Sequence, residues 1–519
     1  PLDAGGPVAR AEAVLAHARP ALLITSAALA GSVDGSGAEL VLVDDSLFAA
    51  EAAAEPVPPP APVAAGDPAY VIYTSGSTGQ PNGVRIGHGA LDQFVAGATA
   101  RYGVTAADRV LQFAPLHFDA SVEELFLALC AGATLVLRTE AMLQSIPRFL
   151  AACAASAISV LDLPTAFWHE LAFCVSEGQA ALPAALRCVI IGGEAALPER
   201  IARWRRVADP RILLLNTYGP TEATVVATVA ALDADPGDEP APIGLPLPGV
   251  ACAIVDERGL LARPGAEGEL CLLGGGLALG YLGDPALTDR RFVALAELPG
   301  APRAYRTGDL VRRRADGQLV YLGRCDDELK ISGHRVNPAE VETALLALPG
   351  VREAAVIGVS GPGGLKQLAA HVAADESIDP AALRRGLLER LPAALVPARI
   401  IVAAALPKTR SGKIDRALLR AAPAAPAAEA PQATELERQV LRVWAEVLGR
   451  ADLVPGDDFF ALGGQSLQTI QVATRLGAEL GREIAVATLF RHPTAAGLAQ
   501  ALDAGPAPVP AADEELAAL

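Results

Sequence analysis

The sequence lacks a long hydrophobic run, since no stretch of about eighteen uninterrupted apolar residues occurs, and a membrane span is therefore not expected. It also lacks an excess of basic residues. Its 42 Lys and Arg stand against 59 Asp and Glu, a formal net charge of −17. This balance argues against a nucleic-acid partner, because phosphate backbones need clustered cations. It does not exclude a nucleotide site, which needs only local donors.

Paired cysteine motifs are absent too. The seven cysteines include no CxxC and no spacing next to histidine, which is typical of reduced thiols and predicts a cytoplasmic protein. The sequence has no signal peptide and no initiator methionine, and it opens on PLDAGGPVAR. We therefore expect it to be a piece of a longer chain.

The apolar pattern predicts several domains in series. From about 70 to 325, short apolar runs alternate with helical patterns, which indicates an α/β sheet covered on both faces, with more antiparallel strands after 243. A compact αβ unit follows. The Ala/Pro-rich segment AAPAAPAAEAPQAT then predicts an extended linker, and a small helical domain comes after it.

The loop after the first strand carries the strongest single motif, YVIYTSGSTGQPNGV at 70–84. Its hydroxyls and glycines can wrap a polyphosphate, although it has no Walker A lysine. Alone, it equally fits an ordinary Ser/Gly turn. Four further motifs follow in order: NTYGPTEAT, YRTGDLVRR, YLGRCDDELKISGHRV and LPKTRSGKIDR.

This ordered set resembles the adenylate-forming superfamily, and specifically the adenylation domains of nonribosomal peptide synthetases, over essentially residues 1–420. The resemblance implies an enzyme that forms an acyl-adenylate and pyrophosphate from a carboxylate and ATP with Mg²⁺. It implies an α/β multi-layer large lobe at 1–325, incomplete by about a hundred residues at its start, and a small mobile α+β C-terminal lobe at 326–420. A linker (421–433), an all-α four-helix carrier domain (434–505) and a tail (506–519) complete the expected division.

The resemblance also implies roles for individual residues. Tyr218 would stack on adenine with Asn216 nearby, Asp309 would accept the ribose hydroxyls, and Arg324 would lie close to ribose and phosphate. The residues expected to hold the β- and γ-phosphates of ATP are Ser75, Gly76, Ser77, Thr78 and Gly79.

Four more residues are assigned to chemistry and motion. Thr221 would meet phosphate, and Glu222 would hold Mg²⁺. Lys413 would bridge the substrate carboxylate and the α-phosphate. Asp326 matches the hinge about which the small lobe swings between adenylation and thiol transfer. One departure is Asn82, where the family's phosphate loop carries lysine, and we expect it to reduce activity without abolishing it.

The substrate pocket is expected to take an amino acid. Asp119 would grip the α-ammonium, and two acidic positions in the pocket, Glu123 and Asp162, require a second cation because buried carboxylates are costly alone. We predict a diamino acid, lysine first, then β-lysine and ornithine, with arginine less favoured. The alternative is that one carboxyl is protonated or faces solvent. The remaining pocket positions are Ala120, Ile190, Gly192, Thr217, Val225 and Val226.

The last domain resembles a peptidyl carrier protein, on the match DDFFALGGQSLQTIQ. Ser466 would start a helix and carry 4′-phosphopantetheine, whose thiol accepts the aminoacyl group, although an N-cap serine has the same geometry. This implies a phosphopantetheinyl transferase, neighbouring domains such as condensation domains, and a place in secondary metabolism such as antibiotic biosynthesis. Whether a small activating partner protein is needed stays open.

Two other functions remain possible at this stage. The first is an acyl-CoA ligase of the same fold, which a linked carrier and the amine anchor Asp119 disfavour. The second is a truncated, weakly active module that serves mainly as a carrier or docking unit, supported only by Asn82 and the abrupt start. Serine-hydrolase chemistry is disfavoured because the G-x-S-x-G elbow is missing.

Overall fold

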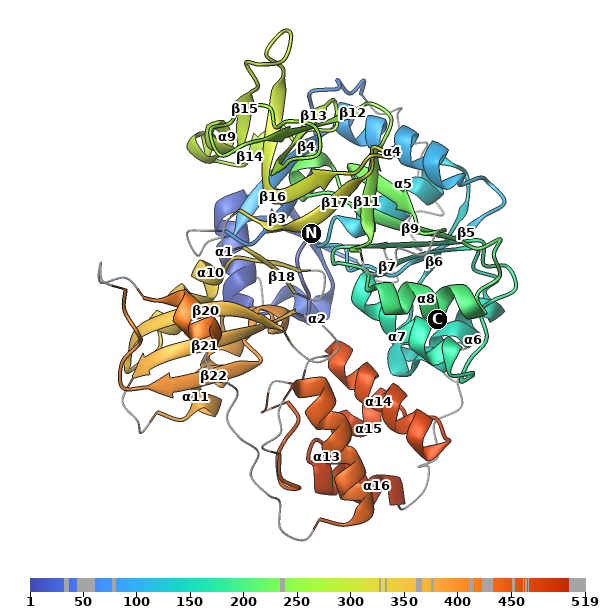
Figure 1. Cartoon of the computed structure of the whole chain (residues 1–519), viewed down its shortest axis with the longest axis vertical. Helices are drawn as coiled ribbons and strands as arrows, with labels where there is room; N and C mark the ends of the chain where they lie inside the picture. The colour runs from blue at the N-terminus through green and yellow to red at the C-terminus, as the bar shows by residue number, and fades with distance from the viewer. Residues whose placement is uncertain are drawn as a thin grey trace.

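The chain folds into a large α/β lobe, a small α+β lobe and a helical domain (Figure 1). The computed structural model describes residues 1–31, 37–43, 61–76, 81–233, 239–325, 328–331, 334–360, 366–374, 378–409, 414–421, 433–449, 453–460, 462, 464 and 466–503.

A mixed sheet of twelve strands, counted within the described residues, organises the large lobe. Its parallel part has the order β9-β8-β7-β5-β6, with β9 Leu213–Tyr218, β8 Cys188–Gly192, β7 Val160–Pro164, β5 Arg109–Gln112 and β6 Thr134–Leu137. The central strands β7, β8 and β9 are mostly apolar and buried, as parallel strands covered by helices must be, whereas the edge strand β6 is partly exposed. The covering helices include α4 His88–Tyr102, α5 Ala120–Cys130, α6 Ile146–Ala155, α7 Thr165–Ser176 and α8 Pro198–Val207.

The sheet continues with antiparallel strands, as the glycine-rich pairs after 243 predict. In order from β9 they are β10 Thr228–Ala231, β11 Pro242–Pro246, β17 Leu319–Arg324, β16 Arg303–Arg313, β13 Glu267–Gly274 and β12 Val250–Val255, with β15 Phe292–Ala294 paired to β16. A smaller sheet joins β3 Pro68–Thr74, β4 Asn82–Gly87 and β14 Gly280–Tyr281, beside α9 Pro285–Arg291. The N-terminal segment adds α1 Val8–Ala18, β1 Leu22–Thr25, α2 Ala27–Ala30 and β2 Glu39–Leu42.

The small lobe begins with a hairpin, β18 Leu329–Ile331 and β19 His334–Val336, that reaches toward the large lobe. Behind it lies the sheet β20 Val351–Ser360, β21 Lys366–Ala374 and β22 Arg399–Ala403, packed against α10 Pro338–Leu346 and α11 Pro380–Leu388. Helix α12, Arg416–Ala421, ends the lobe.

The helical domain has the four helices that the sequence predicts: α13 Glu435–Leu448, α14 Ser466–Leu480, α15 Val486–Arg491 and α16 Ala495–Asp503. Thr434 caps α13 in a capping box with Glu437. The expected fold class, with a large lobe, a small lobe and a four-helix domain, is confirmed. Across the described part of the chain, no helix combines the length and the apolar character that crossing a membrane requires.

Candidate functional site

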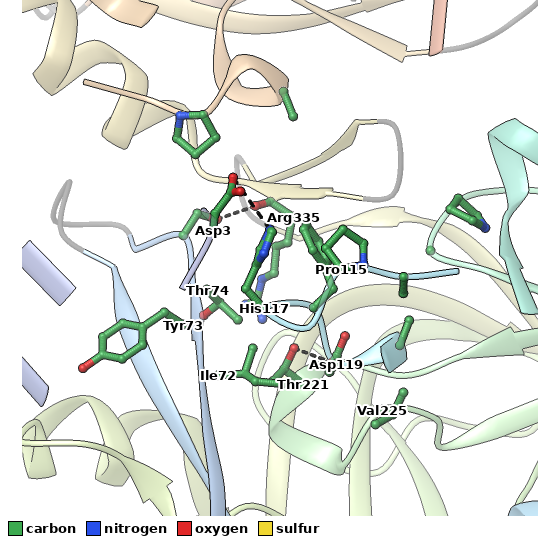
Figure 2. Close-up of a pocket in the computed structure, with 18 of the residues that line it drawn as sticks. Asp3, Ile72, Tyr73, Thr74, Pro115, His117, Asp119, Thr221, Val225 and Arg335 are labelled. Carbon is green, nitrogen blue, oxygen red and sulfur yellow. Dashed lines mark hydrogen bonds and ion pairs between the residues drawn. The ribbon is translucent and has the colours of Figure 1, made fainter. Parts of the chain in front are cut away.

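A cavity of about 700 Å³ lies between the large lobe and the small lobe (Figure 2). Its walls come from the end of β3, the loop before α5, the ends of β7, β8 and β9, and the β18–β19 hairpin. The carboxyl ends of parallel strands meet at one sheet edge, where α/β folds bind ligands. The volume suits a nucleotide or a small organic acid.

Asp119 stands at the start of α5 and faces this cavity. The hydroxyl of Thr221 donates a hydrogen bond of 2.6 Å to its Oδ2, and Figure 2 shows the two side chains pointing toward each other. Burial raises the pKa of Asp119, and the Thr221 hydrogen bond opposes that rise. The site thus places the carboxyl group of Asp119 at the cavity wall, where it can pair with a cation.

An acidic pair forms another wall of the cavity. Glu123 and Asp162 are 2% and 9% exposed, and burial together with the mutual proximity of their charges raises the pKa of Glu123. Burial and the neighbouring charge of Glu124 raise the pKa of Asp162. Tyr102, 1% exposed at the end of α4, lies against Glu123. Among the described residues, Glu123 Oε1, Asp162 Oδ2 and the Tyr102 hydroxyl find no hydrogen-bond partner.

The other predicted pocket positions divide into two groups. Ala120, Gly192, Thr217, Val225 and Val226 line the cavity. A Cβ on Gly192 would come within 2.6 Å of Thr217 Oγ1, so only glycine fits there. The predicted lining residue Ile190 instead lies in the apolar core behind the wall, 1% exposed, because side chains alternate along β8.

A positive φ directs the chain beside the pocket. Thr224 and Val225 have φ of 57° and 66°, which is uncommon for β-branched residues and is found where the surrounding structure enforces it. The kink follows β9 and brings Val225 to the cavity (Figure 2).

Three of the residues expected around adenine and ribose form hydrogen bonds with one another. The Tyr218 hydroxyl donates to Asp309 Oδ2 at 2.5 Å, and Arg324 donates to Asp309 Oδ1 at 2.7 Å. Lys330 of β18 holds its ammonium 4.9 Å from the centre of the Tyr218 ring. Asn216 is not brought to the cavity, because its amide donates to the carbonyl of Pro242 at 2.7 Å inside the sheet.

Glu222 is 1% exposed and accepts two hydrogen bonds of 3.0 Å from Arg335 of β19 and one of 2.6 Å from Tyr281. Burial raises the pKa of Glu222, but the Arg335 charge and the Tyr281 hydrogen bond outweigh it and hold the pKa below its usual value. Ser75 donates its hydroxyl to the carbonyl of Arg335 at 2.5 Å. The β18–β19 hairpin therefore contacts both the first residue of the phosphate loop and the candidate metal ligand.

Three predicted residues of the phosphate loop, Ser77, Thr78 and Gly79, lie outside the described residues, as do Asp326 and Lys413. Gly76 is buried next to Ser75 but does not line the cavity. The backbone of Ser466 begins α14, as predicted, and its side chain is not described.

Sequence reasoning missed three residues of this site. Tyr102 ends helix α4, 21 residues before Glu123 and 60 before Asp162, and only its position before the Gly103 helix stop distinguishes it. Lys330 and Arg335 belong to the motif YLGRCDDELKISGHRV, from which only Arg324 and Asp326 were assigned roles. Their positive charges in a motif for a phosphate-binding enzyme could have indicated a place in the site.

Three family models match the chain. The AMP-binding enzyme model covers residues 1–282, the AMP-binding enzyme C-terminal domain covers 340–413, and the phosphopantetheine attachment site covers 438–502. Their order agrees with the lobes and the helical domain described above.

Curated relatives include the isonitrile lipopeptide synthase of Streptomyces coeruleorubidus, 54% identical over 97% of this chain and 34% of that protein. The phosphinothricin tripeptide synthetase PhsC of Streptomyces viridochromogenes is 38% identical over 97% of this chain and 46% of that protein. The chain thus spans less than half the length of these relatives.

Among solved structures, holo-PA1221, an NRPS protein containing adenylation and PCP domains, has a TM-score of 0.72 at 26% identity and covers 96% of this chain and 91% of its own. The fused adenylation–PCP protein NpsA-ThdA of Klebsiella oxytoca has a TM-score of 0.68 at 25% identity, covering 77% of each chain. The o-succinylbenzoate CoA synthetase MenE of Bacillus subtilis, 23% identical with a TM-score of 0.71 and covering 81% of this chain and 82% of its own, shares the fold.

Proposed function

The chain belongs to the family of AMP-binding enzymes, with an adenylation domain followed by a phosphopantetheine attachment domain, and from that premise we propose that it activates a diamino acid and tethers it to its own carrier. The observation that carries this proposal is the buried acidic pair of the cavity, Glu123 and Asp162, each with one carboxylate oxygen that has no hydrogen-bond partner among the described residues. ATP would supply the adenylyl group, and a phosphopantetheinyl transferase would modify Ser466. Neighbouring synthetase domains would consume the thioester, and all seven free cysteines fit a cytoplasmic site of action.

The nucleotide would lie against β9 and β16. Tyr218 offers a ring face for adenine, and Asp309 offers acceptor oxygens for ribose once its partners shift. The phosphates would meet the loop that starts at Ser75 and Gly76 and continues through Ser77, Thr78 and Gly79. Lys413 would then stabilise the charge that develops as the substrate carboxylate attacks the α-phosphate.

Glu222 is the candidate ligand for Mg²⁺. Its carboxylate is ionised and buried, and a hard cation prefers such oxygen donors, with phosphates and water supplying the rest. When bound, Mg²⁺ would neutralise phosphate charge. Arg335 contacts the same two oxygens, so the β18–β19 hairpin must withdraw before a metal can bind there. We propose that this withdrawal is the lobe rotation about Asp326.

The substrate class follows from charge and donor number. Asp119 would bind the α-ammonium. Glu123 and Asp162 line the cavity, and each offers one unpartnered carboxylate oxygen to a lysine-type ammonium, which has three donors. A guanidinium has five donors in a rigid plane, which matches this set less well. Lysine is therefore the first candidate, with β-lysine and ornithine next.

Lysine binding should strengthen as the pH rises. In the free pocket the raised pKa values keep the acidic pair protonated in part, so an incoming ammonium must displace a proton. The KM for lysine should fall as the pH rises toward the raised pKa values of the pair, by up to about tenfold per pH unit, the limit for one released proton. Pyrophosphate exchange at a series of pH values measures this KM. Norleucine, which shares the α-amino group and the chain length but lacks the second ammonium, is the control. Equal pH dependence for both amino acids would refute proton displacement.

The acceptor is tested with the holo protein. Incubation with ATP, Mg²⁺ and lysine should add one lysyl group to the phosphopantetheine arm, detected by intact mass spectrometry and released by hydroxylamine. Free CoA should not be acylated at a comparable rate. Preferential formation of lysyl-CoA would instead identify a CoA ligase.

A further inference from the structure

The carrier domain is seated on one face of the large lobe (Figure 1). Helix α14 packs against α7, and one continuous apolar cluster extends from Trp168 and Leu171 of the lobe into the carrier. Four polar residues of the lobe also contact the carrier. We name Gln144, Ser145, Arg148 and Glu170 the carrier-docking surface.

The buried part of this contact joins Glu170 and Gln471. The Gln471 amide donates to Glu170 Oε1 at 3.2 Å, and the two residues are 1% and 3% exposed. Arg475, one turn further along the same face of α14, adds an attractive charge near Glu170. A buried carboxyl group needs partners, and the carrier provides one hydrogen bond, to Oε1, and one nearby positive charge, in addition to the charge of Arg200 in the lobe. Glu170 therefore favours a carrier whose helix α14 has Gln471 and Arg475 at these positions.

The outer part of the contact is centred on Glu483, which precedes α15. Its Oε1 accepts from Ser145 Oγ at 2.6 Å and from Arg148 Nε at 2.8 Å. The backbone N–H of Ala487 donates to Gln144 Oε1 at 3.2 Å. The contacts thus extend over two carrier helices and fix the orientation of the domain as well as its position.

We infer that the carrier-docking surface recognises this chain's own carrier for aminoacyl loading, and that it does so through contacts with Gln471 and Glu483 of the carrier. Gln471 lies five residues after Ser466, about 7.5 Å along the helix axis. Holding Gln471 therefore fixes the start of the helix that bears the attachment serine. The inference rests on the proposed function, since it concerns the loading step.

The test uses two residue swaps in the full-length holo chain. Arg148→Glu and Glu483→Arg each place like charges together, and the double variant restores an opposite pair. Gln471→Glu sets two carboxylates against each other, and adding Glu170→Gln recreates the amide–carboxylate pair in reverse. We expect each of these three single changes to slow single-turnover loading of lysine by about tenfold, and each double variant to recover most of the rate.

Arg438→Glu is the matched control, because among the described residues the ion pair of Arg438 is the local one with Glu435 on α13, at 2.6 Å. Pyrophosphate exchange should stay at the parental level in every variant. Absence of exchange in all proteins, the parent included, would contradict the proposed function and not the docking inference. Hydrogen exchange of α14 without substrates should rise in the single variants and return in the doubles, which reports docking without catalysis. Wild-type loading in the single variants, or doubles that show no rescue, would overturn the inference.

Discussion

A Ser466→Ala variant is expected to lose aminoacyl loading down to the background of the unmodified protein, while its ATP–pyrophosphate exchange stays near the parental level. Adenylation would take place at the cavity between the lobes, whereas Ser466 begins a helix in a separate domain. Under the proposed function the phosphopantetheine arm is attached to this hydroxyl, so its removal would leave no thiol acceptor. Radiolabelled amino acid retained after acid precipitation measures the loading.

Loss of a helix-start hydroxyl could also destabilise the carrier, by about 0.5–2 kcal/mol. Thr434→Ala is the matched control, because it removes the side-chain cap of α13, a hydrogen bond of 3.2 Å to the Glu437 N–H, from the same domain. This control should keep its loading. Full loading of the Ser466→Ala protein would show that another residue carries the arm, and equal loss in both variants would point to unfolding.

A Glu123→Gln, Asp162→Asn double variant is expected to lower kcat/KM for lysine by about a hundredfold or more, since it leaves the second ammonium of lysine buried without a counter-charge. The same variant should improve activity toward norleucine, because no carboxyl then needs a proton or a cation. The two replacements keep the shape of both side chains. Pyrophosphate exchange with lysine and with norleucine measures the ratio of their kcat/KM values.

Glu124→Gln provides the comparison within the same helix. Glu124 is equally buried, but its oxygens already accept the backbone N–H groups of Phe113 and Ala114 at 2.9–3.1 Å. Its replacement should lower activity toward both amino acids alike and leave their ratio unchanged. If the Glu123→Gln, Asp162→Asn variant kept the parental ratio of kcat/KM for lysine to kcat/KM for norleucine, the proposal of a diamino acid substrate would be contradicted.

The fold could be predicted from the sequence because the motifs follow one another in a fixed order and the strands are short apolar runs between helices. Asp119, Glu123 and Asp162 could be placed from the family resemblance, and the structure brings them together at the cavity from the start of α5 and the middle of β7. Ile190 could not, because a one-residue alternation along β8 decides which side chain faces the cavity.

Long-range contacts escaped prediction for a different reason. The approach of Tyr102 to Glu123 depends on how α4 packs against α5, and the Arg335–Glu222 pair depends on the position of the small lobe. The seat of the carrier on α7 depends on two polar pairs that are 301 and 335 residues apart in the chain. Local patterns carry no information about such distances.

The most direct test of the account is ATP–pyrophosphate exchange with labelled pyrophosphate across lysine, β-lysine, ornithine, arginine, glutamate and leucine. We expect the exchange rate to be highest with a diamino acid, lysine first, and to be near background with leucine and glutamate. A peak on leucine or glutamate would contradict the acidic pocket as the basis of selection, and no exchange with any of the six would contradict the proposed activity of this chain.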